Sequence, residues 1–357
     1  QSLNANTTAS YNTAVGQAAL TLNTTGAGNT AVGNNSLDAN TTANYNTGIG
    51  YSALSANTTG TNNVGIGYLS LSTSTTGSSN TAVGQASAFS STTGPNNVAI
   101  GLNALYYNQT GGQNVAIGAS ALTGASGQSH TGNVAIGQQA MSALSTGGSN
   151  VAVGAYAGDA LTTGSGHTLI GYNAGSALTS GTALTALGYQ AGLAVTTGSN
   201  NVLIGHSSGD AITTGASNVT LGNNTLGAVT TASNNTALGA NAGLAVTSGS
   251  QNVFVGTQAG VANTTAANNT IIGYVAGDAI TTGGSNTAIG AEALGANTTG
   301  ASNTAVGKSA GAANTTGTQL TVVGLSAGAA HTTGTFNTFL GYESGITCTT
   351  PSYSTAV

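Results

Sequence analysis

A repeat of 17 residues runs through the whole chain and constrains its fold more than any other feature. Its marker is a glycine that closes pentapeptides such as Asn-Thr-Ala-Val-Gly at 12–16. These anchor glycines lie at 16, 33, 50, 67, 84, 101, 118, 137, 154, 171, 188, 205, 222, 239, 256, 273, 290, 307, 324 and 341. The one irregular step has two additional residues, within 119–136. Such self-similarity is typical of a repeat architecture, so we expect one domain over 1–357, with a loop at the insertion.

Each repeat contains one short strand directly before its anchor glycine. Counting from the anchor, position −1 is aliphatic in all 20 copies, and position −3 is always Thr or Val. Side chains two residues apart point to the same side of a strand, and β-branched residues suit a pleated surface. We therefore expect positions −1 and −3 to face the core, and position −2, which is mostly Ala, to face solvent.

The composition of the repeat predicts an all-β chain. The 57 Gly and abundant Asn and Thr disfavour helices, and no helical periodicity is present. The fold that fits is a parallel β-solenoid of about 21 turns, which stack at about 4.8 Å into a rod of about 100 Å. Like residues then form ladders, in which Asn and Thr side chains bond to the turns above and below.

Charge is almost absent, which excludes several classes of partner. The chain has 1 Lys or Arg against 6 Asp or Glu, for a net charge of −5. Binding to nucleic acid or to an anionic membrane needs a cationic surface, so we expect neither. No apolar run approaches the ~20 residues of a membrane-spanning helix, and a single Cys348 cannot form an internal disulfide.

The seven charged residues occupy only positions +1, +2 and +5 of the repeat, so we expect these positions to face solvent. Like charges stacked in ladders would repel each other, which explains their scarcity. The charged residues are Lys308 at +1, Glu292 and Glu343 at +2, and Asp38, Asp159, Asp210 and Asp278 at +5.

Apparent catalytic motifs follow the repeat and do not indicate an enzyme. The stretch 205–209 (GHSSG) has the spacing of a G-x-S-x-G nucleophile elbow around Ser207, but strings of this form recur in the same phase at 307–311 and 324–328. Lys308 lies between Gly and Ser as in a phosphate-binding loop, yet the glycine expected five residues before Gly307 is Ser302. A hydrolase that uses Ser207 is the weakest functional class.

We also expect no metal site and no cofactor. The histidines lie at unrelated phases of the repeat, and a metal ion needs several ligands that converge on one point. The four histidines are His130, His167, His206 and His331.

Three pentapeptides carry a resemblance to a known family. The sequence Asn-Val-Ala-Ile-Gly at 97–101, 114–118 and 133–137 resembles the core motif of the YadA-like head repeats of trimeric autotransporter adhesins. The wider NTAVG, AL and NTTG pattern is similar to repeats in phage tail-fibre-like and secreted surface proteins. The resemblance implies a left-handed β-roll, an extracellular location, a homotrimer, and a role in adhesion or fibre building.

Self-association is the first expected interaction. Position −2 is larger than Ala in several copies of the second half, and a column of exposed apolar residues predicts an interface between copies of the chain, which we expect to form a trimer. The first and last repeats show no cap, so we expect either end-to-end stacking into a filament or a longer parent protein. The candidate assembly face is Leu169, Leu203, Phe254, Ile271, Val322 and Phe339.

Aromatic residues at position +1 form a second candidate surface. Those on successive turns are Tyr51 and Tyr68, and then Tyr172, Tyr189 and His206. Such a stripe either shields the turn or contacts glycans, whose apolar faces and hydroxyls suit flat rings with polar tips. Glycans are also expected as modifications, and the Thr of +8 and +9 are the better candidates. The Asn-Thr-Thr sequons, such as the one beginning at Asn23, could accept glycans, but we expect their Asn to form a ladder that is inaccessible in the folded chain.

The sequence as a whole predicts a non-enzymatic, extracellular structural or adhesive fibre. The alternatives are a phage tail-fibre-like host-attachment spike and a carbohydrate- or ice-binding solenoid. The repeated Thr-Thr pair suggests ice binding, although adjacent hydroxyls point to opposite sides of a strand. Host, ligand, handedness and number of chains stay open.

Overall fold

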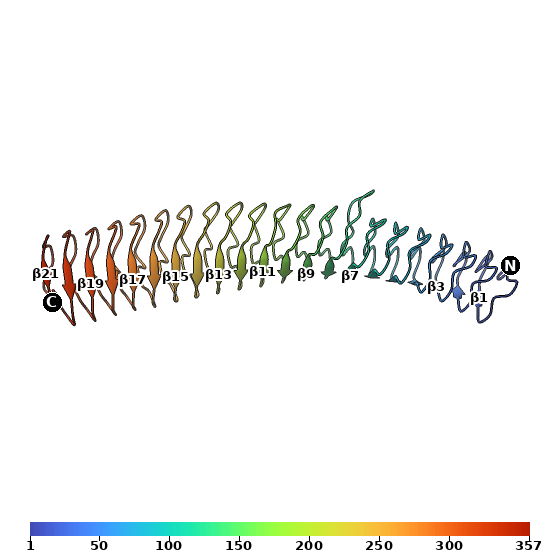
Figure 1. The fold of residues 1–357 in the computed structure, drawn as a ribbon, viewed down its shortest axis with the longest axis horizontal. Coiled ribbons are helices and arrows are strands. Elements are labelled where there is room, and N and C mark those ends of the chain that lie inside the picture. Colours follow the sequence, from blue (N-terminus) through green and yellow to red (C-terminus); the bar gives the residue numbers. More distant parts are fainter. The chain divides into compact units, whose positions relative to one another are not determined.

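The structure, a computed structural model, describes all residues 1–357 and contains short parallel strands joined by turns, with no helix. Each repeat contributes one strand that ends just before its anchor glycine (Figure 1). The strands are β1 (Thr13–Val15), β2 (Thr30–Val32), β3 (Thr47–Ile49), β4 (Val64–Ile66), β5 (Thr81–Val83), β6 (Val98–Ile100), β7 (Val115–Ile117), β8 (Val134–Ile136), β9 (Val151–Val153), β10 (Thr168–Ile170), β11 (Thr185–Leu187), β12 (Val202–Ile204), β13 (Val219–Leu221), β14 (Thr236–Leu238), β15 (Val253–Val255), β16 (Thr270–Ile272), β17 (Thr287–Ile289), β18 (Thr304–Val306), β19 (Thr321–Val323), β20 (Thr338–Leu340) and β21 (Thr355–Ala356).

Within β1 to β10 and within β11 to β21 successive strands pair in parallel, and their register follows the repeat, including its 19-residue step from β7 to β8. Thr13 of β1 lies opposite Thr30 of β2, and Val98 of β6 lies opposite Val115 of β7. The predicted parallel β-solenoid with a 17-residue repeat is therefore confirmed. The chain divides into two compact units, and each is coiled in this way. Unit 1 is 1–182, with β1 to β10, and unit 2 is 183–357, with β11 to β21. The expected single domain over 1–357 stays a prediction.

The expected inward face of the strands is wrong. In each paired strand between β2 and β20 the middle residue is buried, as at Ala82 and Phe254, while its two neighbours are half-buried or exposed. The interior of the coil also receives side chains from positions +3, +4 and +7, such as Ala53, Leu54 and Asn57. These fill most of the narrow interior, which leaves room for one strand side chain per turn, usually a methyl group.

The six residues predicted as an assembly face belong to this core. All six have 0% of their surface exposed: Leu169, Leu203, Phe254, Ile271, Val322 and Phe339. Their size is explained by glycine at position +4 of the preceding turn. A Cβ atom on Gly158 would lie 2.5 Å from Leu169 Cδ1, and one on Gly243 would lie 2.7 Å from Phe254 Cδ2. The larger strand residue occupies the volume that Leu fills at position +4 in other turns.

The anchor glycine is required by its conformation and by the closeness of the next turn. Gly84 has φ of +131°, and a Cβ atom there would lie 2.6 Å from the carbonyl oxygen of Gly101. Side chains rarely adopt this conformation, and no heavy atom approaches that closely without a shift of the backbone. The invariance of the anchor is thus a consequence of stacking.

Asparagine side chains join each turn to the next at two positions. At position −4, Asn97 Oδ1 accepts a hydrogen bond of 3.0 Å from the backbone N–H of Asn114, and Asn97 Nδ2 donates one of 3.0 Å to the carbonyl of Gly111. At position +7, Asn40 Nδ2 donates to Asn23 Oδ1 at 2.9 Å. The expected polar ladders are present, and at position −4 they run mainly from side chain to backbone.

The two-residue insertion forms a loop, as expected. Residues 125–128 are exposed, and this is the longest loop in the coil (Figure 1). Just beyond it the backbone rejoins the ladders: His130 N–H donates to Asn108 Oδ1 at 3.0 Å, and its carbonyl accepts from Asn114 Nδ2 at 2.8 Å. The His130 ring is buried, with 2% of the residue exposed.

Candidate functional site

The predicted aromatic stripe lies on the surface. The four tyrosines are about half-exposed, and His206 is exposed as well. The Tyr51 and Tyr68 rings stack with centroids 5.5 Å apart, and the Tyr189 and His206 rings stack with centroids 5.0 Å apart. Tyr172 meets Tyr156 edge to face at 6.0 Å. Position +1 thus faces solvent as expected, and glycan contact by these rings stays a prediction.

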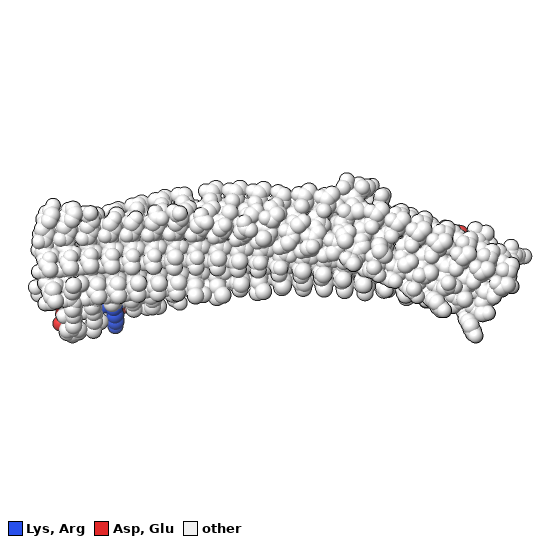
Figure 2. All heavy atoms as spheres, viewed as in Figure 1, with Lys and Arg blue, Asp and Glu red and all other residues white.

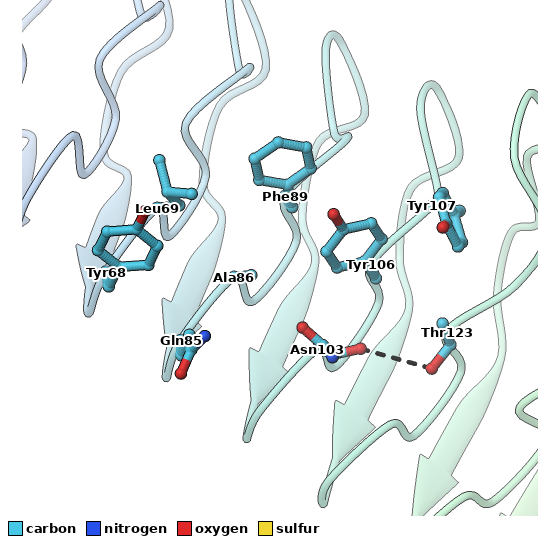
Figure 3. Close-up of a pocket in the computed structure, with 9 residues that line it drawn as sticks. All are labelled: Tyr68, Leu69, Gln85, Ala86, Phe89, Asn103, Tyr106, Tyr107 and Thr123. Atoms are coloured by element: carbon cyan, nitrogen blue, oxygen red, sulfur yellow. Dashed lines mark hydrogen bonds between the residues drawn. The ribbon is translucent and has the colours of Figure 1, made fainter.

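One member of the stripe, Tyr68, also lines a surface pocket in unit 1. The pocket has a volume of about 430 Å³ and lies over the turns that follow β4 to β7 (Figure 3). A row of rings forms one part of its wall, and a row of polar side chains lies alongside. The lining residues are Tyr68, Leu69, Gln85, Ala86, Phe89, Asn103, Tyr106, Tyr107 and Thr123.

The rings of this pocket contact each other in a defined way. Phe89 and Tyr106 stack with centroids 5.0 Å apart and planes inclined by 15°. Tyr107 meets Tyr106 edge to face, with centroids 4.6 Å apart. Phe89, Tyr106 and Tyr107 were not among the predicted site residues, because they do not lie at position +1. Their signal was present in the sequence, since no other repeat has an aromatic residue at +5 or +6.

The seven charged residues leave most of the surface seen in Figure 2 uncharged. Lys308, Glu292 and Glu343 are exposed as expected, but the four aspartates at +5 are only half-exposed. Burial raises the pKa of Asp38 and of Asp159 above the usual range, and backbone hydrogen bonds offset part of this shift. A charged side chain at position +5 is therefore only partly exposed to solvent.

The possible nucleophile Ser207 is almost completely buried. Only 8% of its surface is exposed, and its backbone φ of 49° is that of position +2 in the other repeats. Burial raises the pKa of the nearby Asp210, while backbone hydrogen bonds, the charge of His206 and the Ser207 hydroxyl lower it in part. Ser207 thus lies near the Asp210 carboxylate, and the absence of a hydrolase activity stays a prediction.

The histidines and acidic residues do not gather. No group of three His, Cys, Asp or Glu side chains is placed to hold a metal ion. His331 is fixed as a neutral ring between Asn314 Oδ1 at 3.3 Å and Asn337 Nδ2 at 3.0 Å, which assigns the proton to Nδ1. Burial lowers the pKa of His331, and it lowers that of His130 to about 4. These rings act as core residues.

The possible glycosylation positions differ in access. The +7 asparagines Asn23, Asn40 and Asn57 are fully buried in their ladder, which leaves no room for a glycan on the folded chain. Thr58 at +8 donates its hydroxyl to the carbonyl of Thr75 at 3.1 Å, whereas Thr59 at +9 is exposed. Position +9 is therefore the accessible one.

In each of the two units the outward face of the strands carries a continuous series of aliphatic side chains at position −1, which we call the aliphatic column. None of its members is buried, and Leu221 has 49% of its surface exposed. In unit 1 the column is Val15, Val32, Ile49, Ile66, Val83, Ile100, Ile117, Ile136, Val153 and Ile170; in unit 2 it is Leu187, Ile204, Leu221, Leu238, Val255, Ile272, Ile289, Val306, Val323 and Leu340.

Comparison with known proteins gives no relative. No protein-family model, curated protein or solved structure matches the chain. The resemblance to YadA-like head repeats therefore depends on the pentapeptide motif alone. No helix of the structure is long and apolar enough to cross a bilayer.

Proposed function

We propose that this chain is a non-enzymatic, extracellular structural and adhesive fibre segment that associates with copies of itself along the aliphatic column. The observation that carries the proposal is the column itself. Faces of parallel sheets are normally covered, and contiguous exposed apolar surface marks an interaction site. The assembly face predicted from the sequence, which includes Phe254, lies in the core. The proposed contact is therefore made by outward residues such as Ile100 and Ile136.

A second copy of the chain is the partner that fits the column best. Within each unit successive strands present this residue in parallel register, also across the insertion between β7 and β8, so the columns of two copies have matching spacing. Positions −3 and −1 contain no charged residue in any repeat, so no buried charge opposes the contact. The resemblance to trimeric adhesins implies three chains, and end-to-end stacking into a filament is the alternative.

Sedimentation velocity of the full chain tests this proposal. We expect a multimer for the native sequence and a shift toward monomer for the double substitution Ile100→Lys and Ile136→Lys, which places two charges in the column. The matched control is Thr59→Lys with Thr93→Lys, because these exposed +9 residues lie outside the strands. A monomer at all concentrations, or equal assembly in both variants, would contradict the proposal.

Ice binding is the second function that a specific observation favours. The outward strand face is a regular array in which Thr at −3 alternates with an aliphatic residue at −1, as in β2 and β5. Five strands of unit 1 have Val in place of Thr, which interrupts the hydroxyl rows. Growth of faceted ice crystals in the presence of the chain would favour this function, whereas unmodified crystals with multimers in solution favour the fibre.

An adhesive fibre also accounts for the remaining expectations. A surface with few charges needs another source of solubility, and O-linked sugars at exposed +9 residues such as Thr59 would provide it. A phage tail-fibre-like attachment spike would share the same coil and the same side-by-side contact. An intact mass measurement of the natively produced protein detects the sugars, and an unmodified mass would contradict their presence.

A further inference from the structure

The pocket beside β4 to β7 departs from the repeat in a way that the fold does not require. Residues needed for stacking recur in every turn, as the anchor glycines do. Position +6 is Ala in most repeats and Tyr only at Tyr107, and position +5 is aromatic only at Phe89 and Tyr106. These three departures meet in one pocket, together with the half-exposed Tyr68.

We propose that this pocket binds a neutral saccharide. The proposal rests on the adhesive function above and names the class of ligand. Phe89 and Tyr106 stack on each other, so each ring turns its second face away from the pair. At position +5 of the preceding turn stands the small Ser72, which leaves the outer face of Phe89 without a stacking partner within the coil. Flat aromatic faces of this kind suit the apolar C–H faces of sugar rings.

The polar side of the pocket fits hydroxyl groups. The side-chain amides of Gln85 and Asn103 lie alongside the rings (Figure 3). The hydrogen bond drawn there runs from the Thr123 hydroxyl to the backbone carbonyl of Asn103 at 3.5 Å, so it leaves both side-chain amides open. Each amide offers two donors and an acceptor, which is the mixed pattern that sugar hydroxyls satisfy. The Thr123 hydroxyl donates to the carbonyl of Ser120 at 2.9 Å and can still accept. A few convergent polar groups beside apolar walls are typical of a ligand site.

Charge separates a neutral saccharide from other ligands with flat or polar parts. No charged residue lines the pocket, so phosphate or carboxylate groups of a nucleotide or an acidic sugar would find no cation. A wholly apolar ligand would cover the amides of Gln85 and Asn103 and offer them no hydrogen-bond partner. A neutral ligand with many hydroxyls pairs both sides of the pocket.

A structural role for Tyr107 is the competing explanation. The two-residue insertion occupies the next turn, and the backbone N–H of Tyr107 donates to the Thr123 carbonyl at 2.9 Å, just before that loop. A ring that only supports the loop would affect its order and not the binding of sugars. The test therefore measures both properties.

Affinity electrophoresis of the full chain tests the proposal. Native gels are cast with neutral polysaccharides (amylopectin, hydroxyethyl cellulose, galactomannan or xylan) and, separately, with anionic alginate. The variants Phe89→Ser, Tyr106→Ser and Tyr107→Ala introduce residues that other repeats carry at these positions, so the fold accommodates them. The matched control is Tyr274→Ala, which removes an exposed ring at position +1 in unit 2.

We expect at least one neutral polysaccharide to retard the native chain, and alginate not to retard it. Phe89→Ser and Tyr106→Ser should each weaken the binding at least tenfold, while Tyr274→Ala leaves it unchanged. No retardation in any neutral gel, or equal retardation of native and variant chains, would overturn the proposal. So would a Tyr107→Ala chain that exposes 124–132 to protease yet binds as before, because the ring would then be a support.

The outcome is separable from that of the assembly proposal. Phe89 and Tyr106 lie outside the aliphatic column, so their variants should sediment as the native chain does. Saccharide binding by a monomer would refute the proposed assembly and keep the site. A multimer without retardation in the neutral gels would do the reverse.

Discussion

The Phe254→Ala substitution distinguishes sharply between a core and a surface position for the middle residue of each strand. The Phe254 ring lies between two glycines: a Cβ on Gly243 would be 2.7 Å from its Cδ2 atom, and one on Gly260 would be 2.3 Å from its Cε1 atom. These glycines have no side chains that can move into the space. The cavity would therefore persist, and the expected loss of stability is about 3–5 kcal/mol.

Hydrogen exchange measures this loss in the turns concerned. A repeat array need not unfold in a single step, so a local measure is preferable to one melting temperature. The loss should speed exchange of the slowest amides in β14 to β16 by about a hundredfold to several thousandfold. The matched control is Phe336→Ala, since Phe336 lies in the same unit with 47% of its surface exposed. Equal, small effects of the two substitutions would refute the proposed core.

A compensating change adds a second criterion. In the preceding turn Leu226 at +4 is followed by Ala237 at −2, the reverse of Gly243 followed by Phe254. Adding Gly243→Leu to Phe254→Ala reproduces the Leu226 arrangement, and Leu226 already has a positive φ of 48°. The double variant should recover roughly half of the lost stability, because the new side chain fills the cavity at some cost in backbone strain.

Three further substitutions test the ladders and the buried histidine. Gly84→Ala should lower the free energy of unfolding by about 2 kcal/mol or more. The control Gly295→Ala should lower it by less than about 1 kcal/mol, because Gly295 has φ outside the left-handed region and a Cβ there would lie 3.3 Å from its nearest neighbour. Equal losses in denaturant titration would contradict the stacking argument. Asn97→Ala leaves the backbone N–H of Asn114 unpaired and should lower the free energy of unfolding by about 1–3 kcal/mol. The control Thr93→Ala, at an exposed residue, should lower it by less than about 0.5 kcal/mol. An unchanged protection of the Asn114 amide from exchange would contradict the role of this ladder. His130 has a folded-state pKa of about 4, below the ordinary 6.5, so the unfolded chain binds more protons between these two pH values. The free energy of unfolding should therefore fall by about 3 kcal/mol as the pH falls from 6.5 to 4. His130→Leu should reduce that loss in pH-dependent unfolding, and an unchanged pH profile would show that the ring is not buried as a neutral group.

The repeat period, the strands and the parallel coil could be predicted from the sequence because one template recurs with a fixed length. The inward face could not be predicted from one strand alone. Both outward positions of a strand such as β6 are β-branched, and its inward residue is only Ala99, so local hydrophobicity indicates the wrong side. The interior is filled largely by turn residues such as Leu105, which no pattern of alternation within the strand reveals.

A signal for the correct face was present between repeats. Every position −2 residue with a large apolar side chain follows a turn with glycine at +4, as Leu203 follows Gly192 and Phe339 follows Gly328. Contact explains this pairing, since a Cβ on Gly192 would lie 2.9 Å from Leu203 Cδ1. Comparing repeats with each other therefore locates core neighbours that alternation within one repeat misplaces.

The candidate site was predictable only in part. Tyr68 was found because aromatic residues recur at position +1, and outward positions of the template can be recognised by their charges. Phe89, Tyr106 and Tyr107 occur at other phases, and only the stacking of turns brings them together with Tyr68. The shape of the pocket depends on ring orientation, which the sequence does not specify.

The association of chains along the aliphatic column is the central functional claim, and a low-resolution image of the native particle tests it most directly. We expect several chains side by side, with the aliphatic columns of their units directed toward one another and the +1 aromatic residues on the outside. Single chains whose strand faces are open to solvent would contradict it.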